Sequence, residues 1–541
     1  MTVLQNGGSA DYVIVGAGSA GAVLAYRLTE DPTVSVTLIE AGGEAKSLLV
    51  QLPVGFAKLV SHPGYDWRYL QEADPTINGR RFIWSAGKLL GGGSSINGQV
   101  YIRGTRRDYD RWVELGANGW SFDEVLPWFR RSEDWAGPPH PAHGQGGPLS
   151  TAPMQDFHPL CHTFMQACNE HGLPTLADYH GGDMEGVYLT SASQRDGWRC
   201  STEKAFLRPA RKRPNLRVLT HTEVERIHFD GSRAIGVDVV SRGLKQRIEA
   251  RAEVIVSSGT VGSCALLMRS GIGAGETLRK VGVDVVRDLP GVGRNLQEHA
   301  SVGQNKFVNL PTLNSELGAF DMIRHLLRFA AGKKGPLGAP AVQAMGLART
   351  RPELDEPDVQ LHFLPLAYDI AADTVSTASA LMPKEPTVTI NATICQPRSR
   401  GRVELDAQRR PKILHRFFDD ERDVATLVGG QKLIAKLFDT PALRRIVIAD
   451  RAPASPPADD AAWADYVRNK AAPAYHPVGT CRMGRDDMAV VDPATLKVHG
   501  IDGLRVIDAS VIPSITSANT NAAAIMIGER GADMISRVAR R

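Results

Sequence analysis

Asp11-Tyr-Val-Ile-Val-Gly-Ala-Gly-Ser-Ala-Gly21 is the stretch of sequence that decides the fold. Its β-branched run predicts a buried strand, and the abrupt change to glycine predicts a tight turn into a helix. Gly16 permits the turn, Gly18 lets the backbone approach a pyrophosphate, and Gly21 lets the helix pack closely on the strand. The residues from Val34 to Glu40 predict a second strand, so the segment forms a βαβ unit.

Glu40 ends this second strand roughly 20 residues after the glycines, where a carboxylate can accept hydrogen bonds from a ribose diol. The same negative charge would repel a 2′-phosphate, which disfavours NADP. The N-terminus of the intervening helix adds partial positive charge that suits a pyrophosphate. The unit therefore predicts a dinucleotide site, with FAD and NAD both open at this point.

A second glycine-rich stretch is Gly87-Lys-Leu-Leu-Gly-Gly-Gly-Ser-Ser-Ile-Asn-Gly98. It holds too many small residues for a packed strand, and its backbone N–H groups, with Ser94, Ser95 and Asn97, can wrap a polar ring or a diphosphate. A merely flexible loop is the alternative. Two glycine-rich cradles suit a long cofactor held at both ends, which favours FAD over NAD.

The composition limits the classes of protein to which this chain can belong. A chain of 541 residues is too long for one compact core, which predicts two domains or one large domain with an insertion. Hydrophobic residues make up 43% and charged residues 23%, as in ordinary enzymes, and the net charge of +4 is spread along the chain, which argues against nucleic-acid binding. The six cysteines form no C-x-x-C pair, which indicates free thiols in a reducing compartment.

Targeting and membrane signals are weak. The residues before Asp11 lack a basic start and an apolar stretch, and no window reaches the roughly 20 apolar residues of a spanning helix. We therefore expect a cytoplasmic enzyme, with peripheral membrane contact left open. The amphipathic pattern from Asp321 to Ala331 predicts a helix, and core packing is favoured over membrane binding.

Two further segments bear on the organisation of the chain. Gly137 to Gly147 is rich in Pro and Gly and predicts a surface loop. Its His140 and His143 could form a metal pair, but a solvated loop is favoured because no acidic or cysteine ligands accompany them. Leu504 to Asp508 predicts a strand near the end of the chain, so the two halves of the nucleotide-binding fold are expected to come from opposite ends.

Several separate motifs resemble those of the glucose-methanol-choline (GMC) oxidoreductase family. The resemblance covers nearly the full length and includes two departures: Cys264 stands where proline or serine is usual, and Ser85-Ala86 where Pro-Arg is frequent. The matching stretches are Gly87 to Asp110, Gly259-Thr-Val-Gly-Ser263 with Ser270-Gly-Ile-Gly273, Leu289 to His299, Ser399 to Leu405, His476-Pro-Val-Gly-Thr-Cys-Arg-Met-Gly484 and Asn519-Thr-Asn521.

The resemblance implies an α/β and α+β fold, in which a Rossmann-like FAD-binding domain carries an inserted substrate domain built on an antiparallel sheet with helices. We expect residues 1–155, 196–305 and 460–541 in the FAD-binding domain, and residues 156–195 and 306–459 in the substrate-binding domain. Family members that tether the flavin have a histidine where Ile96 stands. Isoleucine has no nucleophile, so noncovalent FAD is expected.

The reaction implied is oxidation of an alcohol, in which a hydroxyl proton and a hydride leave, the hydride going to N5 of the flavin. His476 is the expected general base, because imidazole suits proton transfer near neutral pH, and Asn519 is expected to orient the substrate oxygen. His299 is expected to be structural. The cofactor-binding candidates are Gly16, Gly18, Ser19, Ala20, Gly21, Glu40, Ala41, Gly91, Gly92, Ser94, Asn97, Gly98, Val100, Val224 (at the adenine ring), Gly259, Asp508, Ala509 and Asn521.

Three questions stay open at this stage. The electron acceptor is oxygen, or else a quinone or protein. A non-redox lyase like the hydroxynitrile lyases is an alternative on the same fold, whereas a flavin-storing protein is disfavoured because His476 and Asn519 are both present. The substrate is a primary alcohol or polyol: Phe363, Leu364, Tyr368 and Phe417 are compatible with an apolar or aromatic alcohol, or with a cage for choline.

Overall fold

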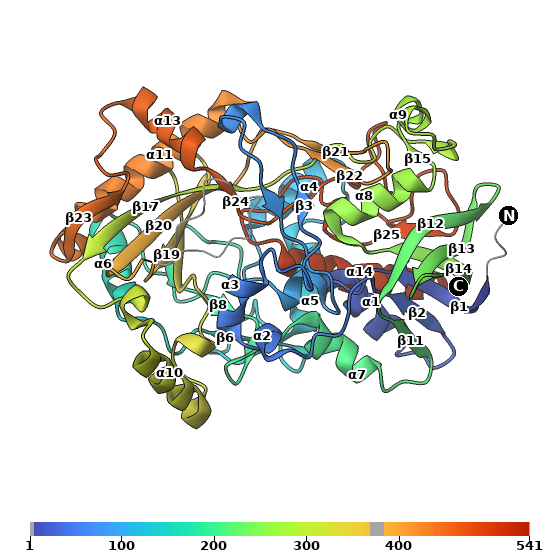
Figure 1. Ribbon diagram of the computed structural model, residues 1–541, viewed down its shortest axis with the longest axis horizontal. Helices are drawn as coiled ribbons and strands as arrows, with labels where there is room; N and C mark the ends of the chain where they lie inside the picture. The colour runs from blue at the N-terminus through green and yellow to red at the C-terminus, as the bar shows by residue number, and fades with distance from the viewer. Residues whose placement is uncertain (1–4, 368–382, 540–541) are drawn as a thin grey trace.

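Two β-sheets organise the molecule, one toward each end of its long axis in Figure 1. The computed structural model describes residues 5–367 and 383–539. The first sheet has seven strands in the order β11 (Leu216–Leu219), β2 (Val36–Ile39), β1 (Gln5–Val15), β14 (Leu244–Val256), β13 (Arg233–Ser241) and β12 (Thr222–Asp230), with β25 (Leu504–Val506) paired to β14.

The first sheet is parallel through β11, β2, β1, β14 and β25, and antiparallel from β14 to β12. Val13 and Ile14 of β1 are fully buried, as expected of a strand covered on both faces. The placement of β25 beside β14 confirms that segments from opposite ends of the chain build this sheet.

Helices α1 (Ser19–Leu28) and α14 (Asn521–Ala539) pack together beside this sheet. Their approach is close: a Cβ at Gly528 would lie 3.0 Å from Cα of Ala20. The guanidinium of Arg27 donates two hydrogen bonds to the buried carboxylate of Glu529, at 2.7 and 2.8 Å. The first and last helices of the described chain are therefore joined by apolar packing and a buried ion pair.

The second sheet has six strands, all paired antiparallel: β18 (Ala344–Ala348), β19 (Val359–Leu364), β20 (Thr387–Ile394), β17 (Ala300–Val308) and β23 (Val447–Ala452), with β24 (Ala472–Pro473) paired to β17. Phe363 and Ile390 pack in one apolar cluster with side chains of α6 (Leu160–Glu170) and α11 (Glu421–Phe438). Strand β17 crosses the expected domain limit at residue 305, and β24 lies beyond the expected limit at residue 460. We retain the division into two domains as a proposal.

Short elements connect the two sheets. The helices are α2 (Leu48–Gln51), α3 (Phe56–Leu59), α4 (Arg106–Glu114), α5 (Phe122–Ser132), α7 (Arg208–Ala210), α8 (Gly259–Arg269), α9 (Gly275–Lys280), α12 (Pro441–Arg444) and α13 (Asp460–Lys470). The strands are β3 (Tyr69–Leu70), β4 (Ile83–Trp84), β5 (Glu133–Trp135), β6 (Leu149–Pro153), β7 (Gly186–Leu189), β8 (Ser191–Ala192), β9 (Gln194–Arg195), β10 (Trp198–Arg199), β15 (Ile272–Gly273), β16 (Arg287–Asp288), β21 (Arg402–Leu405) and β22 (Pro411–Leu414).

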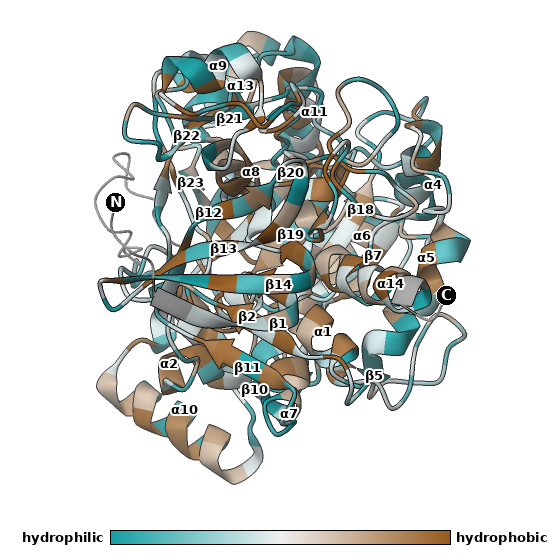
Figure 2. Ribbon diagram, turned by 90° about the vertical axis from the view of Figure 1, so that its right-hand side faces the viewer, coloured by the Kyte–Doolittle hydropathy of each residue, from teal (hydrophilic) through white to brown (hydrophobic). Residues whose placement is uncertain are grey.

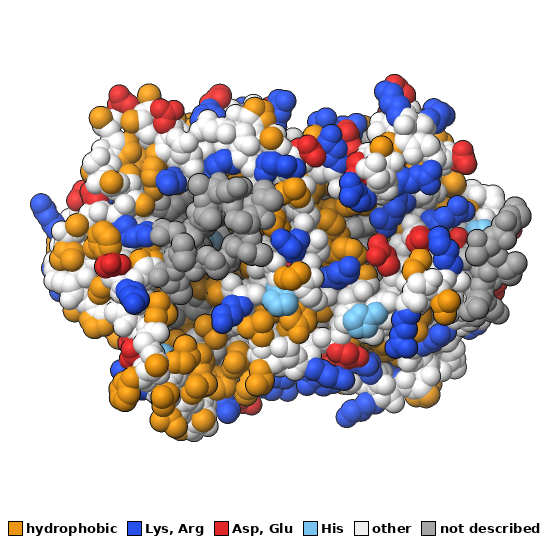
Figure 3. Space-filling view, in the orientation of Figure 1, with side chains coloured by type: hydrophobic (Ala, Val, Ile, Leu, Met, Phe, Trp, Pro, Cys, Tyr) orange, Lys and Arg blue, Asp and Glu red, His pale blue; other side chains and the backbone are white. Residues whose placement is uncertain are grey.

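Helix α10 (Ala319–Gly332) overturns one expectation. The amphipathic helix is present, but it projects from the body of the molecule (Figures 1 and 2), and most of its large apolar side chains are exposed. Leu327 is 65% exposed and Ile323 56%, and they contribute to the apolar patch at the lower left of Figure 3. Core packing was therefore the wrong prediction for this face. His325 and Phe329 are the buried residues of this helix, and Met322 and His325 line the cavity described below.

The cysteines behave as predicted. All six lie in the described part of the chain, and each is buried with a free thiol. None of the helices between residues 5 and 539 that the structure describes is long and apolar enough to cross a membrane.

Candidate functional site

A cavity of about 1420 Å³ is lined by residues of both sheets. Val15 and Ile39, at the ends of the parallel strands β1 and β2, belong to its wall, and so do Ser301 and His362 of the antiparallel sheet. Ligands of α/β sheets bind at the carboxyl ends of the parallel strands, and this cavity has that position.

Three helices begin at this cavity. Gly18 precedes α1, Gly259 is the first residue of α8, and Asn521 is the first residue of α14, and all three residues line the wall. The Ser19 hydroxyl donates a hydrogen bond to Oδ1 of Asn521 at 2.6 Å, which joins two of these helix ends. Unpaired N–H groups and the helix dipoles concentrate partial positive charge there, which suits an anionic group such as a pyrophosphate.

The glycines of the wall leave room for a flat cofactor. An added Cβ would meet nothing within 4 Å at Gly18, Gly93, Gly98 or Gly259, so the backbone at these positions faces open space. Gly92 differs, because its Cβ would lie 2.7 Å from Cα of Gly18. The two glycine-rich stretches therefore meet each other, instead of holding opposite ends of a cofactor as expected. The residues fit FAD, which needs a long cavity with exposed backbone N–H groups.

Two buried carboxylates shape the wall. Glu40 accepts hydrogen bonds from the backbone N–H groups of Ala17 at 3.0 Å and Gly42 at 2.8 Å, and burial raises its pKa to about 7. Asp508 accepts one from the N–H of Gly259 at 2.8 Å, so it caps the start of α8, and burial raises its pKa as well. Each carboxylate thus fixes a loop or helix end of the wall.

Most of the predicted cofactor residues line the cavity. They are Gly16, Gly18, Ser19, Ala20, Glu40, Ala41, Gly92, Asn97, Gly98, Val100, Val224, Gly259, Asp508, Ala509 and Asn521. Gly21, Gly91 and Ser94 lie behind the wall. A Cβ at Gly21 would lie 2.0 Å from the carbonyl oxygen of Gly16, and the Ser94 hydroxyl donates to the carbonyl of Gly91 at 2.6 Å. These three residues shape the backbone that the others present.

His476 and Asn519 are brought together at the cavity, although 43 residues separate them. Nδ2 of Asn519 lies 2.8 Å from Nε2 of His476. On the other side of the ring, Nδ1 of His476 lies 3.0 Å from Nδ1 of His299, whose Nε2 lies 3.2 Å from the carbonyl oxygen of Cys395. We call this series, Cys395–His299–His476–Asn519, the histidine relay.

The relay fixes the tautomer of each imidazole. A carbonyl oxygen can only accept, so the proton of His299 lies on Nε2 and its Nδ1 accepts from Nδ1–H of His476. Nε2 of His476 then carries a lone pair, which accepts from the Asn519 amide. Burial lowers the pKa of His299 to about 4, and burial with the neighbouring His299 and His362 lowers the pKa of His476 well below 6.5. Both rings are therefore neutral near pH 7, and His476 presents a free base to the cavity.

Glu298 supports the relay and was missed by the sequence analysis. Both of its carboxylate oxygens accept from the backbone N–H of His476 at 2.9 Å, and burial raises its pKa to about 8. Tyr475, just before His476, has a left-handed φ of 63°, a conformation that a non-glycine residue adopts at some cost. The only sequence signal was the position of Glu298 beside His299, because its partners are backbone groups.

The antiparallel sheet presents a polar face to the cavity. Its described cavity-lining residues are Ser301, Gly303, His362, Leu364, Asn391 and Thr393, together with Ala472 and Pro473 of β24. Leu364 was predicted to line the pocket and does so. Phe363 does not, because strand alternation points it to the opposite face, where it stacks on Phe164 at 4.9 Å. Phe417 packs against Phe82 and His415 outside the wall, and Tyr368 lies outside the described residues.

Comparisons with known proteins agree with this geometry. Sequence profiles described as GMC oxidoreductase match residues 10–301 and 397–528. An oxygen-dependent choline dehydrogenase of Vibrio vulnificus is 38% identical over 97% of this chain and 94% of its own length, and an alcohol dehydrogenase [acceptor] of Pseudomonas putida is 35% identical over 97% and 96%. The crystal structure of pyridoxine 4-oxidase from Mesorbium loti superposes with a TM-score of 0.87 at 30% identity, covering 98% of this chain and 99% of that one.

The glycines of the wall generate a paired prediction. Gly18→Ala should leave the stability of FAD-free protein unchanged but weaken FAD binding by roughly tenfold or more, because the new methyl group enters open cavity space. Gly21→Ala should lower the free energy of unfolding by about 1–3 kcal/mol, because its Cβ collides with the Gly16 carbonyl. Urea denaturation and fluorescence titration with FAD measure the two effects.

Gly332→Ala is the matched control for both measurements, since its Cβ meets only the Lys334 side chain at 3.7 Å and it lies at the end of α10. If the Gly18→Ala variant binds FAD as tightly as the native protein, FAD does not bind at this part of the wall.

Proposed function

The chain belongs to the GMC oxidoreductase family, and on this premise we propose that it oxidises a primary alcohol with His476 as the general base. It is an FAD-dependent enzyme that acts on CH–OH donors. FAD, when bound, accepts the hydride from the carbon that bears the hydroxyl group. The observation that carries the proposal is the histidine relay, which presents a neutral imidazole to the cavity.

Proton removal is the part of the reaction that the protein itself must perform. An alcohol with a pKa of roughly 16 would cost about 12 kcal/mol to ionise at neutral pH. Nε2 of His476 can take the hydroxyl proton as the hydride leaves, and such general-base catalysis is typically worth about 10² to 10⁴ in rate. Because His476 is already deprotonated in the relay, no prior proton loss is needed.

Asn519 is suited to bind the substrate oxygen. Its Nδ2–H group donates to the same Nε2 that would receive the substrate proton, and its buried Oδ1 has no hydrogen-bond partner among the described residues. An alcohol oxygen that replaced this direct contact would accept from Asn519 and donate to Nε2 of His476. The amide orients this oxygen without adding charge.

The wall supports noncovalent FAD. Ile96 lines the cavity at the position where flavin-tethering relatives carry a histidine, and its hydrocarbon side chain offers no nucleophile. Holding the cofactor is then left to backbone N–H groups, Glu40 and the three helix ends. The buried free thiols support a reducing compartment, and we propose the cytoplasm.

The polar sheet face favours an uncharged alcohol over choline. A trimethylammonium group is bound by carboxylates or aromatic faces, and the described cavity-lining residues of this sheet include neither. Glu316, which also lines the cavity, lies 3.1 Å from Nε2 of His325 and 3.3 Å from the guanidinium of Arg324. Ser301, Asn391 and Thr393 instead offer neutral hydrogen-bonding groups.

The role of His476 can be tested by anaerobic reduction of the bound flavin. His476→Ala should slow bleaching of the flavin spectrum by an alcohol by about 10² to 10⁴ while FAD content stays constant. Since the pKa of His476 is lowered, kcat/KM of the native protein should hold its value as pH falls through 6.5 and decline only below it. His171→Ala, an exposed change at the end of α6, is the control.

A rate that stays within a few-fold of native in His476→Ala would refute the base assignment. Cyanohydrin cleavage without any bleaching would instead favour a lyase.

His299 is a positioning residue in this proposal, and its relay function can be separated from packing. His299→Ala should lower the rate of flavin reduction by roughly 10- to 100-fold, because His476 loses the acceptor that fixes its tautomer. His299→Asn should recover most of this loss, since its Oδ1 can take the place of Nδ1. Equal rates in the two variants, with unaltered thermal unfolding, would show that the tautomer is not controlled by His299.

Substrate class can be tested with a panel of alcohols. Uncharged primary alcohols and polyols should bleach the flavin with at least roughly tenfold higher kcat/KM than choline, because the sheet face lacks a counter-charge. Reoxidation by oxygen or by a soluble quinone, followed in the same cuvette, identifies the acceptor. Preference for choline would contradict the assignment of the polar face.

A further inference from the structure

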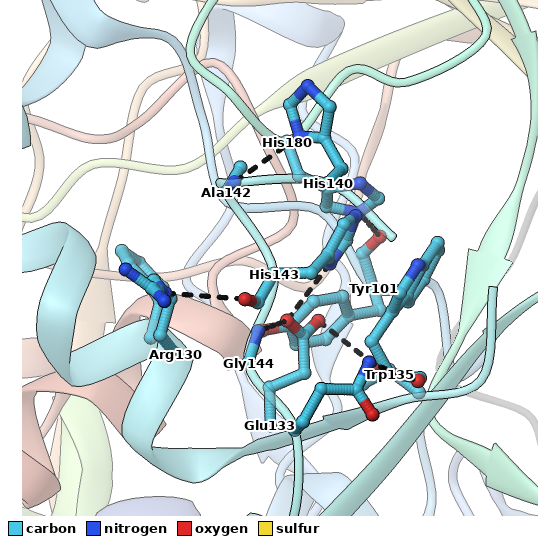
Figure 4. A network of polar contacts seen from close by, with 12 residues as sticks. Tyr101, Arg130, Glu133, Trp135, His140, Ala142, His143, Gly144 and His180 are labelled. Atoms are coloured by element: carbon cyan, nitrogen blue, oxygen red, sulfur yellow. Dashed lines mark hydrogen bonds and ion pairs between the residues drawn. The ribbon is translucent and has the colours of Figure 1, made fainter. Parts of the chain in front are cut away.

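A second cluster of imidazoles and carboxylates lies away from the cavity. It contains His143 of the loop between β5 and β6, together with Asp178 and His180 of the segment that precedes β7. One potential ligand atom from each of these three residues lies within 4.8 Å of the others. Figure 4 shows His140, His143 and His180 gathered on one side of Glu133.

His143 is held rigidly between two carboxylates. Its Nδ1 lies 2.9 Å from Oε2 of Glu133, and its Nε2 lies 2.8 Å from Oδ2 of Asp178. The ring is 1% exposed and stacks on Trp135 with a centroid distance of 3.7 Å and an interplanar angle of 4°. Arg103 also donates to Glu133, at 2.7 Å, which balances the charge of that carboxylate.

His180 carries an orphaned lone pair into the same space. Its Nε2 lies 3.3 Å from the carbonyl oxygen of Tyr101, which can only accept, so the proton lies on Nε2. The opposite nitrogen, Nδ1, is buried without a hydrogen-bond partner among the described residues. It lies 3.8 Å from Oδ2 of Asp178, so two electron-rich atoms face each other, an arrangement that costs free energy unless a cation lies between them.

We propose that Nε2 of His143, Nδ1 of His180 and Oδ2 of Asp178 bind one divalent transition-metal ion, for which Zn²⁺ is the probe. Imidazole nitrogen and carboxylate oxygen are ligands that Zn²⁺ takes in proteins. Tetrahedral coordination at the usual bond lengths separates ligand atoms by roughly 3.3 Å. Here the Asp178 oxygen lies 2.8 Å from Nε2 of His143 and 3.8 Å from Nδ1 of His180, and the two nitrogens lie within 4.8 Å of each other. Small side-chain rotations would therefore close the site around an ion.

The surrounding contacts are those of a supported metal site. Glu133 can accept from Nδ1–H of His143, and the Tyr101 carbonyl accepts from Nε2–H of His180. Each ring can then offer its other nitrogen to an ion that displaces the proton between Nε2 of His143 and Asp178. Asp178 is 19% exposed, which gives the ion an entry path. His140, whose Nδ1 lies 3.7 Å from Oδ1 of Asp178 and which is 43% exposed, or a water molecule completes the coordination.

The sequence favoured a solvated loop here because no acidic ligand was visible near His140 and His143. Folding supplies Asp178 and His180, which follow His143 by more than 30 residues, and it buries His143. The Tyr101 carbonyl, which accepts from His180, follows Val100, and Val100 lines the cavity. A bound ion would therefore link this loop to the cavity wall. The proposed ion is structural, since its ligands lie outside the cavity wall.

Metal titration of the tag-free, FAD-loaded protein tests the proposal. After treatment with a chelator, the protein should bind one equivalent of Zn²⁺ by calorimetry and by elemental analysis, and the ion should raise Tm by roughly 2–5 °C. Co²⁺ should bind with the same stoichiometry and give d–d absorption at wavelengths longer than those of the flavin. Less than one equivalent at saturating Zn²⁺ would overturn the proposal.

Variants locate the ion. His180→Ala and Asp178→Asn should each abolish the Co²⁺ spectrum and the Zn²⁺-dependent rise in Tm, whereas His228→Gln, which removes the β12 histidine beside Arg247, should retain both. Retention of the Co²⁺ spectrum in the first two variants would place the ion elsewhere and refute the assignment. If either variant fails to fold, the stoichiometry and spectrum of the native protein still decide whether a site exists.

Discussion

Three helix N-termini converge on one wall of the cavity, and the rest of the structure depends on this convergence. Helices α1, α8 and α14 come from the beginning, middle and end of the described chain, yet their first residues share a surface. Unpaired N–H groups at buried helix ends need acceptors. Asp508 accepts from the N–H of Gly259 at the start of α8, and the remaining N–H donors at the helix ends are left for an anionic cofactor. Both sheets, and the loop that carries His476, are arranged around this wall.

The parts of the fold and of the candidate site that could be predicted from the sequence are those that depend on local chemistry. Gly16, Gly18 and Gly21 have roles set by their immediate neighbours, so the βαβ unit and the dinucleotide wall followed from spacing alone. His476 and Asn519 were identified through the family motifs, but their contact depends on the fold. The tautomer on which the proposed role of His476 depends requires His299 and Cys395, which lie far away in sequence and were not connected to it by any pattern.

The failures have equally specific causes. Phe363 and His362 are adjacent, and only the phase of β19 decides that the histidine faces the cavity and the phenylalanine faces the core. The apolar residues of α10 carry the periodicity of a packed helix, but periodicity does not say what the face packs against. His143 was interpreted from its sequence neighbours, whereas Asp178 and His180 are supplied by a segment more than 30 residues away.

The ion pair between Arg27 and Glu529 has a consequence for biosynthesis. Arg27 of α1 is synthesised 502 residues before Glu529 of its partner α14, and strand β25 also follows late in the described sequence. Until then the nascent polypeptide holds a positively charged arginine and an apolar helix face without their counterparts. Domains generally fold as units in the order of their synthesis. In this protein, helices α1 and α14 therefore cannot pack together before α14 has been synthesised, and the cavity wall that they share forms only after that point.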